Sequence, residues 1–154
     1  MSRQELIRIA KAGVEAYNAK DWAAAREVLA PGFVYDEVAT GRKVKGVEDV
    51  LNVWRGWAKA FPDSSATFEE PLVDGDVVVQ RLRWRGTHSG PLSLPTGEIL
   101  PTGREIDFRA CQIIRIENGK TVETRQYFDL NTMLSQIGVA QEKEAKAEVR
   151  TKKR

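Results

Sequence analysis

The sequence predicts an α+β fold in which helices cover one face of a curved antiparallel β-sheet. Three segments before Pro62 have apolar residues at helical spacing, and one strand-like segment lies between the second and the third. After Pro62 the apolar residues recur with a period of two, which is typical of strands with one buried face. An Asn-Gly pair between the last two strand-like segments predicts a hairpin.

Each predicted helix has local signals for its ends. Ser2 is a suitable N-cap for the first helix, which the polar sequence "NAKD" ends. The second helix is predicted over Asp21–Leu29, before a Pro-Gly pair. A short strand follows at residues 33–39, and the third helix is predicted over residues 47–61. The helices therefore precede most of the sheet in the chain.

The strand predicted after the turn "DGD" has two faces of clearly different polarity. One face is mainly apolar and the other carries arginines, so we expect the apolar face to point toward the protein interior. The apolar face comprises Val78, Gln80, Leu82, Trp84 and His88, and the opposite face comprises Arg81, Arg83 and Arg85. A loop rich in Gly and Pro is predicted over residues 89–103, followed by the Asn-Gly hairpin and a short closing helix with Asp129 as its N-cap.

The length and composition predict one globular domain. The chain has 154 residues, of which 42% are hydrophobic and 30% charged. We assign residues 1–138 to the domain and residues 139–154 to a charged tail that forms a frayed helix or is disordered. No apolar run is long enough for a membrane span and no signal peptide is recognisable, so we expect a cytoplasmic protein without membrane contact.

Several classes of site are disfavoured by composition. Cys111 and His88 are the only cysteine and the only histidine, which excludes a zinc site of the Cys/His type, and we expect no metal. The net charge of +2 indicates no nucleic-acid-binding surface on the domain. We expect Cys111 to be a small buried or half-buried strand residue.

Long stretches of the chain resemble a known family. The stretches "YNAKDWAAAREVLAPGFVYD", "PTGREIDFRACQIIRIENGKTVETRQYFDL" and "LSQIG" are similar to SnoaL-like polyketide cyclases and ester cyclases, within the nuclear-transport-factor-2-like and ketosteroid-isomerase-like superfamily. The resemblance covers residues 4–138. It implies a cone of curved sheet that three N-terminal helices close around an apolar pocket, and it implies a homodimer.

The resemblance and the strand faces together suggest which residues line the pocket. By analogy with the family, Phe108 and Gln112 join the pocket face, as do Gln126 and Phe128 on the last strand. With Trp84, the helix residues Tyr17 and Trp54 are the expected walls. These aromatic residues form the predicted substrate-binding set.

Two catalytic templates of the superfamily fit the chain incompletely. The catalytic carboxylate of the SnoaL-like cyclases corresponds to Gln126, whose amide cannot accept a proton from carbon. The general base of ketosteroid isomerase corresponds to Asp36, which we place on a pocket face between Val34 and Val38. In the same template Gln112 takes the place of the oxyanion-hole carboxyl, and Gly13 that of the oxyanion-hole tyrosine.

The leading hypothesis is cofactor-free enolisation of an apolar or polycyclic carbonyl compound, by an isomerase or a cyclase of the lyase class. Asp36 is the expected base, Gln112 and Gln126 hold the carbonyl oxygen, and His88 assists. The alternative is a noncatalytic module that binds a small molecule or mediates dimer contacts. Epoxide hydrolysis is a weaker third option, because the arginines are expected to point away from the pocket.

Overall fold

The computed structural model describes residues 1–139 and confirms the α+β fold. The predicted tail, residues 139–154, lies outside the described residues except for Val139, so the division of the chain at residue 138 stays a prediction. The helices are α1 (Arg3–Ala19), α2 (Trp22–Val28), α3 (Val47–Ala60) and α4 (Leu130–Gln136), with a short 3₁₀ turn η1 (Val38–Thr40).

The main sheet is seven-stranded, in the order β2-β1-β9-β8-β5-β3, and β4 also pairs with β5. Its long strands are β5 (Val77–Thr87), β8 (Glu105–Glu117) and β9 (Lys120–Phe128). The shorter ones are β1 (Leu29–Glu37), β2 (Arg42–Lys45), β3 (Ser65–Phe68) and β4 (Leu72–Asp74). The sheet is curved and does not close into a barrel.

Three features of the sheet differ from the sequence prediction. The strand β1 pairs with β9 in parallel, whereas every other pair in the sheet is antiparallel. The segment expected to be only a turn before α3 contains β2, which forms a hairpin with β1. The loop at residues 89–103 contains a small separate hairpin, β6 (Leu92–Leu94) with β7 (Gly97–Ile99). No short turn links β1 to β9, so local sequence does not determine the direction of their pairing.

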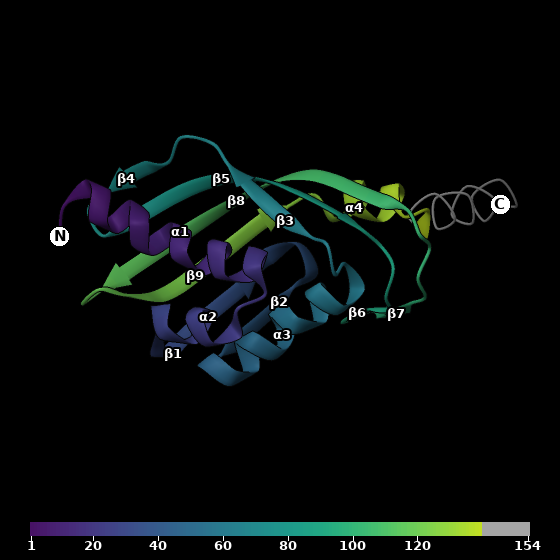
Figure 1. Cartoon of the computed structure of the whole chain (residues 1–154), viewed down its shortest axis with the longest axis horizontal. Coiled ribbons are helices and arrows are strands. Elements are labelled where there is room, and N and C mark those ends of the chain that lie inside the picture. The colour runs from purple at the N-terminus through teal and green to yellow at the C-terminus, as the bar shows by residue number, and fades with distance from the viewer. Residues whose placement is uncertain (140–154) are drawn as a thin grey trace, which may run out of the picture.

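The helices and the concave face of the sheet enclose the core. Figure 1 shows α1 lying along the long strands β5, β8 and β9, with α2 and α3 beside it over β1. Along α1, Val14 packs with Leu82 and Ala110 of the sheet, while Ile9 packs with Ile114. Each buried Val, Leu or Ile side chain of this kind contributes about 1.5 to 3 kcal/mol to folding. The predicted faces of β5 are confirmed, because its arginines are exposed and Val78, Gln80 and Leu82 are buried.

Local signals set the ends of several elements as expected. The Ser2 side chain accepts a hydrogen bond from the backbone N–H of Glu5, and Asp129 accepts two from the first turn of α4. The β8–β9 turn places Asn118 and Gly119 at positive φ, as its sequence predicts. In the part of the chain that the structure describes, no helix is long and apolar enough to span a bilayer.

Candidate functional site

The candidate site is a cavity between α1, α3 and the concave face of the sheet. It offers about 90 Å³ of space to the centres of water-sized molecules, several times what a single buried water requires. Its lining on β8 extends from Ile106 to Ile114, a stretch of roughly 26 Å at about 3.3 Å per residue. The cavity is therefore elongated along the strands, and most of its wall is apolar.

Seven of the residues singled out by sequence lie in this lining, and two do not. Both glutamines and all five aromatic residues contribute to the wall: Tyr17, Trp54, Trp84, Phe108, Gln112, Gln126 and Phe128. Asp36 and His88 are absent from it. The lining also contains Gly13, where a Cβ atom would meet nothing within 4 Å. The glycine at the position of the isomerase tyrosine thus faces open space.

The expected position of Asp36 is wrong, because β1 presents its other face to the interior. Phe33, Tyr35 and Glu37 are buried, whereas Asp36 is half-buried and Val38 is exposed. The side chains of Phe33 and Tyr35 are larger than those of the valines, so burying them removes more apolar surface from water. Asp36 therefore lacks the desolvated pocket position on which its assignment as a base depended.

His88 is buried, as its strand face predicted, but behind the pocket wall. Its exposed fraction is 0%, and its ring packs against Phe61, which itself lines the cavity. The backbone N–H of Thr102 donates to Nδ1 at 3.2 Å, which assigns the proton of the neutral ring to Nε2. Burial lowers the pKa of His88. His88 is therefore a neutral, buried side chain outside the cavity lining.

A chain of side-chain hydrogen bonds crosses four neighbouring strands beneath the cavity. Gln80 Nε2 donates to Gln112 Oε1 at 3.0 Å, and Gln112 Nε2 donates to Gln126 Oε1 at 2.9 Å. Gln126 Nε2 donates to the Tyr35 hydroxyl at 3.0 Å, and this hydroxyl donates to Glu37 Oε2 at 2.8 Å. Every donor in the chain therefore points toward the carboxylate of Glu37.

The partners at the two ends fix the direction of this chain. The carbonyl oxygen of Ala10 can only accept, so Gln80 presents its nitrogen there, at 3.1 Å. The indole N–H of Trp84 can only donate, so Gln126 presents its oxygen to that group, at 3.3 Å. Gln112 lies between the two and must accept from Gln80 and donate to Gln126. The amide orientations consequently follow from groups whose hydrogen-bonding role is not ambiguous.

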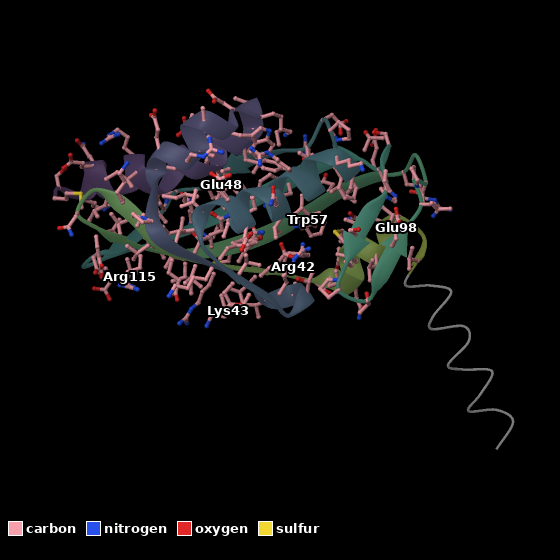
Figure 2. The ribbon with its side chains drawn as sticks, turned by 90° about the horizontal axis from the view of Figure 1, so that it is seen from below. Arg42, Lys43, Glu48, Trp57, Glu98 and Arg115 are labelled. Carbon is pink, nitrogen blue, oxygen red and sulfur yellow. The ribbon has the colours of Figure 1, made fainter. Side chains whose placement is uncertain are left out.

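Glu37 is a fully buried carboxylate with four hydrogen-bond donors. Its Oε2 accepts from Tyr35 and from the Trp57 indole at 2.8 Å, and its Oε1 accepts from Thr40 at 2.6 Å and Arg42 at 2.9 Å. Figure 2 shows Arg42 and Trp57 next to each other. Burial, and then the Glu37 carboxylate, hold the pKa of Tyr35 well above its usual value. Tyr35 is therefore a neutral hydroxyl at physiological pH.

A second polar point in the cavity wall is a pair of hydroxyls. Tyr17 Oη lies 2.7 Å from Ser64 Oγ, and both side chains line the cavity. Burial raises the pKa of Tyr17 to about 12, although the hydrogen bond with Ser64 opposes this effect. The edge of one ring meets the face of the other between Tyr17 and Trp84, with centroids 5.2 Å apart.

Sequence reasoning missed five side chains of the candidate site, for identifiable reasons. They are Tyr35, Glu37, Trp57, Ser64 and Thr121. The large aromatic residues of the "FVYDE" segment were a signal for the true interior face of β1. Glu37 also lies directly opposite Arg42 across the β1–β2 hairpin, a pairing visible only once that hairpin is recognised. Thr121 enters the lining because an irregularity in the β8–β9 register changes the alternation near Val122.

The described residues contain no group of three His, Cys, Asp or Glu side chains placed to hold a metal ion. Glu37, which accepts from the lining residues Tyr35 and Trp57, is already hydrogen-bonded as described above.

A curved, open sheet closed by helices around an elongated apolar cavity defines the ketosteroid-isomerase-like class of folds. The chain belongs to the SnoaL-like polyketide cyclase family, which matches residues 7–137. This confirms the family suggested by the sequence. A comparison with curated proteins gave no match.

Solved structures share this fold. IdmH from Streptomyces antibioticus, a candidate polyketide cyclase, is 31% identical with a TM-score of 0.73, over 87% of this chain and 99% of that chain. A candidate SnoaL-like polyketide cyclase from Jannaschia sp. CCS1 is 22% identical with a TM-score of 0.79, over 89% and 95%. A Catenulispora acidiphila protein with a ketosteroid-isomerase-like fold, solved with trimethylamine, is 18% identical with a TM-score of 0.71, over 85% and 92%.

Proposed function

We propose that the protein binds an elongated, largely apolar carbonyl compound in this cavity and promotes its enolisation, which leads to intramolecular aldol cyclisation or to isomerisation. The observation that carries the proposal is the fixed direction of the glutamine chain. Because Gln112 and Gln126 each present the nitrogen of the amide in one orientation, the wall offers donors to a ligand oxygen. The family and its fold are consistent with cyclase or isomerase chemistry.

Each of these amide nitrogens carries two hydrogens. One hydrogen of Gln112 is bonded to Gln126, and one of Gln126 is bonded to Tyr35. Within residues 1–139 neither nitrogen has a second acceptor, so one N–H of each is available to a carbonyl oxygen in the cavity. A donor aimed at a developing enolate in a low-dielectric cavity lowers the barrier by about 3 kcal/mol.

The source of the proton limits the substrate class. Of the described residues, those that line the cavity include no Asp, Glu or His. Both oxygens of Glu37 already accept two hydrogen bonds each, which leaves that carboxylate poorly suited to take a proton from carbon. We therefore favour compounds whose C–H is acidified by one carbonyl and by a second carbonyl or an aromatic ring, as in polyketide chains and in 2-tetralone. Such a proton can pass to water or hydroxide while the amides stabilise the enolate.

The same lining favours a second candidate function, noncatalytic binding of the same class of compound. In this function the donors of the wall hold the carbonyl oxygen, and no proton leaves the ligand because the lining has no Asp, Glu or His in the described residues. Binding and enolisation must therefore be measured separately.

The test uses 2-tetralone, an enolisable bicyclic ketone, and tetralin, the matching hydrocarbon. Quenching of tryptophan fluorescence reports binding, because Trp54, Trp57 and Trp84 line the cavity. Exchange of the α-protons for deuterium, followed by NMR, reports enolisation. We expect tighter binding of 2-tetralone than of tetralin and exchange faster than in buffer. Gln126→Met should lose the preference for the ketone and slow the catalysed exchange by about 100-fold.

Each result has a defined meaning. Ketone preference without faster exchange identifies a binding module and excludes enolisation of this probe. Equal binding of 2-tetralone and tetralin contradicts carbonyl recognition by the glutamines. Tetralin binding by Gln126→Met, together with its thermal unfolding, shows whether the variant keeps its cavity.

A further inference from the structure

The Tyr17–Ser64 pair has one more hydrogen than the structure uses. Two hydroxyls joined by one hydrogen bond use one of their two O–H hydrogens, whichever of them donates. Tyr17 is neutral at physiological pH because burial raises its pKa to about 12, so its hydrogen is present. No other hydrogen bond of either hydroxyl is found among the described residues. The exposed fractions are 7% for Tyr17 and 5% for Ser64, so bulk water scarcely reaches the remaining donor.

Several contacts hold the serine in place. The backbone N–H of Ser64 donates to Phe61 O at 2.9 Å, and its carbonyl accepts from the Lys20 ammonium. The adjacent Asp63 carboxylate accepts from the backbone N–H of Thr87 at 2.7 Å and from its hydroxyl at 2.8 Å. A Cβ atom on Gly86 would lie 3.0 Å from the Ser64 Cβ, so the glycine permits this close approach to β5. The serine hydroxyl is therefore pre-positioned at the cavity wall.

The end of α1 holds the tyrosine against the same segment. Asn18 donates to Ala66 O at 3.0 Å and accepts from the Ala66 N–H at 2.9 Å. The ammonium of Lys20 lies 4.1 Å from the centroid of the Tyr17 ring. Both hydroxyls thus belong to a rigid junction between α1 and β3, which reduces the entropy lost when a ligand binds.

We propose that the Tyr17–Ser64 hydroxyl pair is a second polar anchor, which donates a hydrogen bond to a second oxygen of the ligand. This inference rests on the proposed binding of a carbonyl compound at Gln112 and Gln126. The Trp84 indole lies between the two anchors, because its N–H reaches Gln126 and its ring contacts Tyr17. The preferred ligand therefore carries two acceptor oxygens on opposite sides of an apolar, ring-sized segment.

The experiment compares methoxy- and ethyl-substituted 2-tetralones. The two substituents have nearly the same shape, and only the methoxy group has an acceptor oxygen. Substitution at ring positions 5, 6, 7 and 8 samples different separations from the ketone oxygen. For at least one position we expect wild-type protein to bind the methoxy compound about three- to tenfold more tightly than its ethyl analogue.

Variants separate the two anchors. The double variant Tyr17→Phe/Ser64→Ala should lose the methoxy preference and keep the preference for 2-tetralone over tetralin. Gln126→Met should keep the methoxy preference and lose the preference for 2-tetralone over tetralin. Either single hydroxyl variant should keep part of the methoxy preference, because the remaining hydroxyl still donates.

The failures are distinguishable. If wild-type protein prefers 2-tetralone to tetralin but no methoxy compound to its ethyl analogue, the second anchor is wrong and the carbonyl site stands. If the double variant keeps the full methoxy preference, the oxygen binds elsewhere and the inference is also wrong. If the ketone preference itself is missing, the proposed function fails first.

Discussion

The buried carboxylate of Glu37 determines how the polar side chains beneath the cavity are arranged. Its charge requires the Tyr35 hydroxyl to donate toward it, and this leaves the tyrosine oxygen as an acceptor for Gln126. A neutral side chain at this position would remove that requirement. We therefore regard Glu37 as a positioning residue for the donors in the wall, not as a base.

Replacing Glu37 should be far more damaging than replacing its neighbour Asp36. Glu37→Ala leaves Arg42, Tyr35 and Trp57 without their common acceptor in a site with 0% exposure. We expect a loss of about 3 to 5 kcal/mol in the free energy of unfolding, measured with urea. The control Asp36→Ala should change it by less than about 0.5 kcal/mol. Similar losses of unfolding free energy in both variants would show that the hydrogen bonds to Glu37 do not determine the stability of this region.

The single histidine gives an expected pH dependence that one variant tests. Burial lowers the pKa of His88 in the folded protein below the value of about 6.5 expected in the unfolded chain. As the pH falls through about 6.5 the unfolded state therefore takes up the proton first, and stability falls until the pH reaches the folded-state pKa. Urea unfolding between pH 8 and 5.5 should show this decline. His88→Asn should remove it, and an unchanged decline in that variant would assign it to another group.

At the scale of elements, helix α1 forms part of the cavity wall and contains a glycine that lowers its own helical stability. Gly13 lies in the helix interior and faces the cavity, and a Cβ atom there meets nothing within 4 Å. Gly56 in α3 has the same freedom but does not line the cavity. The two glycines form a matched pair for separating stability from binding.

Gly13→Ala and Gly56→Ala should each raise the free energy of unfolding by about 0.5 to 1 kcal/mol, because alanine loses less backbone entropy in a helix. Only Gly13→Ala fills cavity space, so only this variant should weaken binding of 2-tetralone. Urea unfolding and fluorescence titration check the two effects. Equal affinities in the two variants would place the ligand away from α1.

The strands show when the alternation of residue types in the sequence predicts which face of a strand points to the interior. On β5 the alternation of apolar residues and arginines gave the correct interior face, because large differences in burial energy separate the two sets. On β1 each face contains apolar residues and one carboxylate, so polarity alone did not predict the interior face. The face with the larger aromatic residues is the buried one. The register irregularity that brings Thr121 to the cavity has no signal in local alternation.

At the scale of the whole molecule, the outer face of the sheet carries alternating charges, including the Arg83–Asp107 and Arg125–Glu123 ion pairs. The homodimer implied by the family resemblance stays a prediction, and this face is where we expect it to form. The helices occupy the opposite, concave face, so a dimer of this kind leaves the cavity unchanged.

The sequence by itself determined the class of fold, the order of the helices, the caps at Ser2 and Asp129, and the interior face of β5. These features depend on local propensity and on the periodicity of burial, both of which are properties of short segments. Only the tertiary structure decided that β1 runs parallel to β9 and turns Glu37 inward instead of Asp36. It also joined Tyr17 to Ser64 and three glutamines into one directed chain. These contacts join residues 14 to 91 positions apart, and their geometry depends on how whole elements pack.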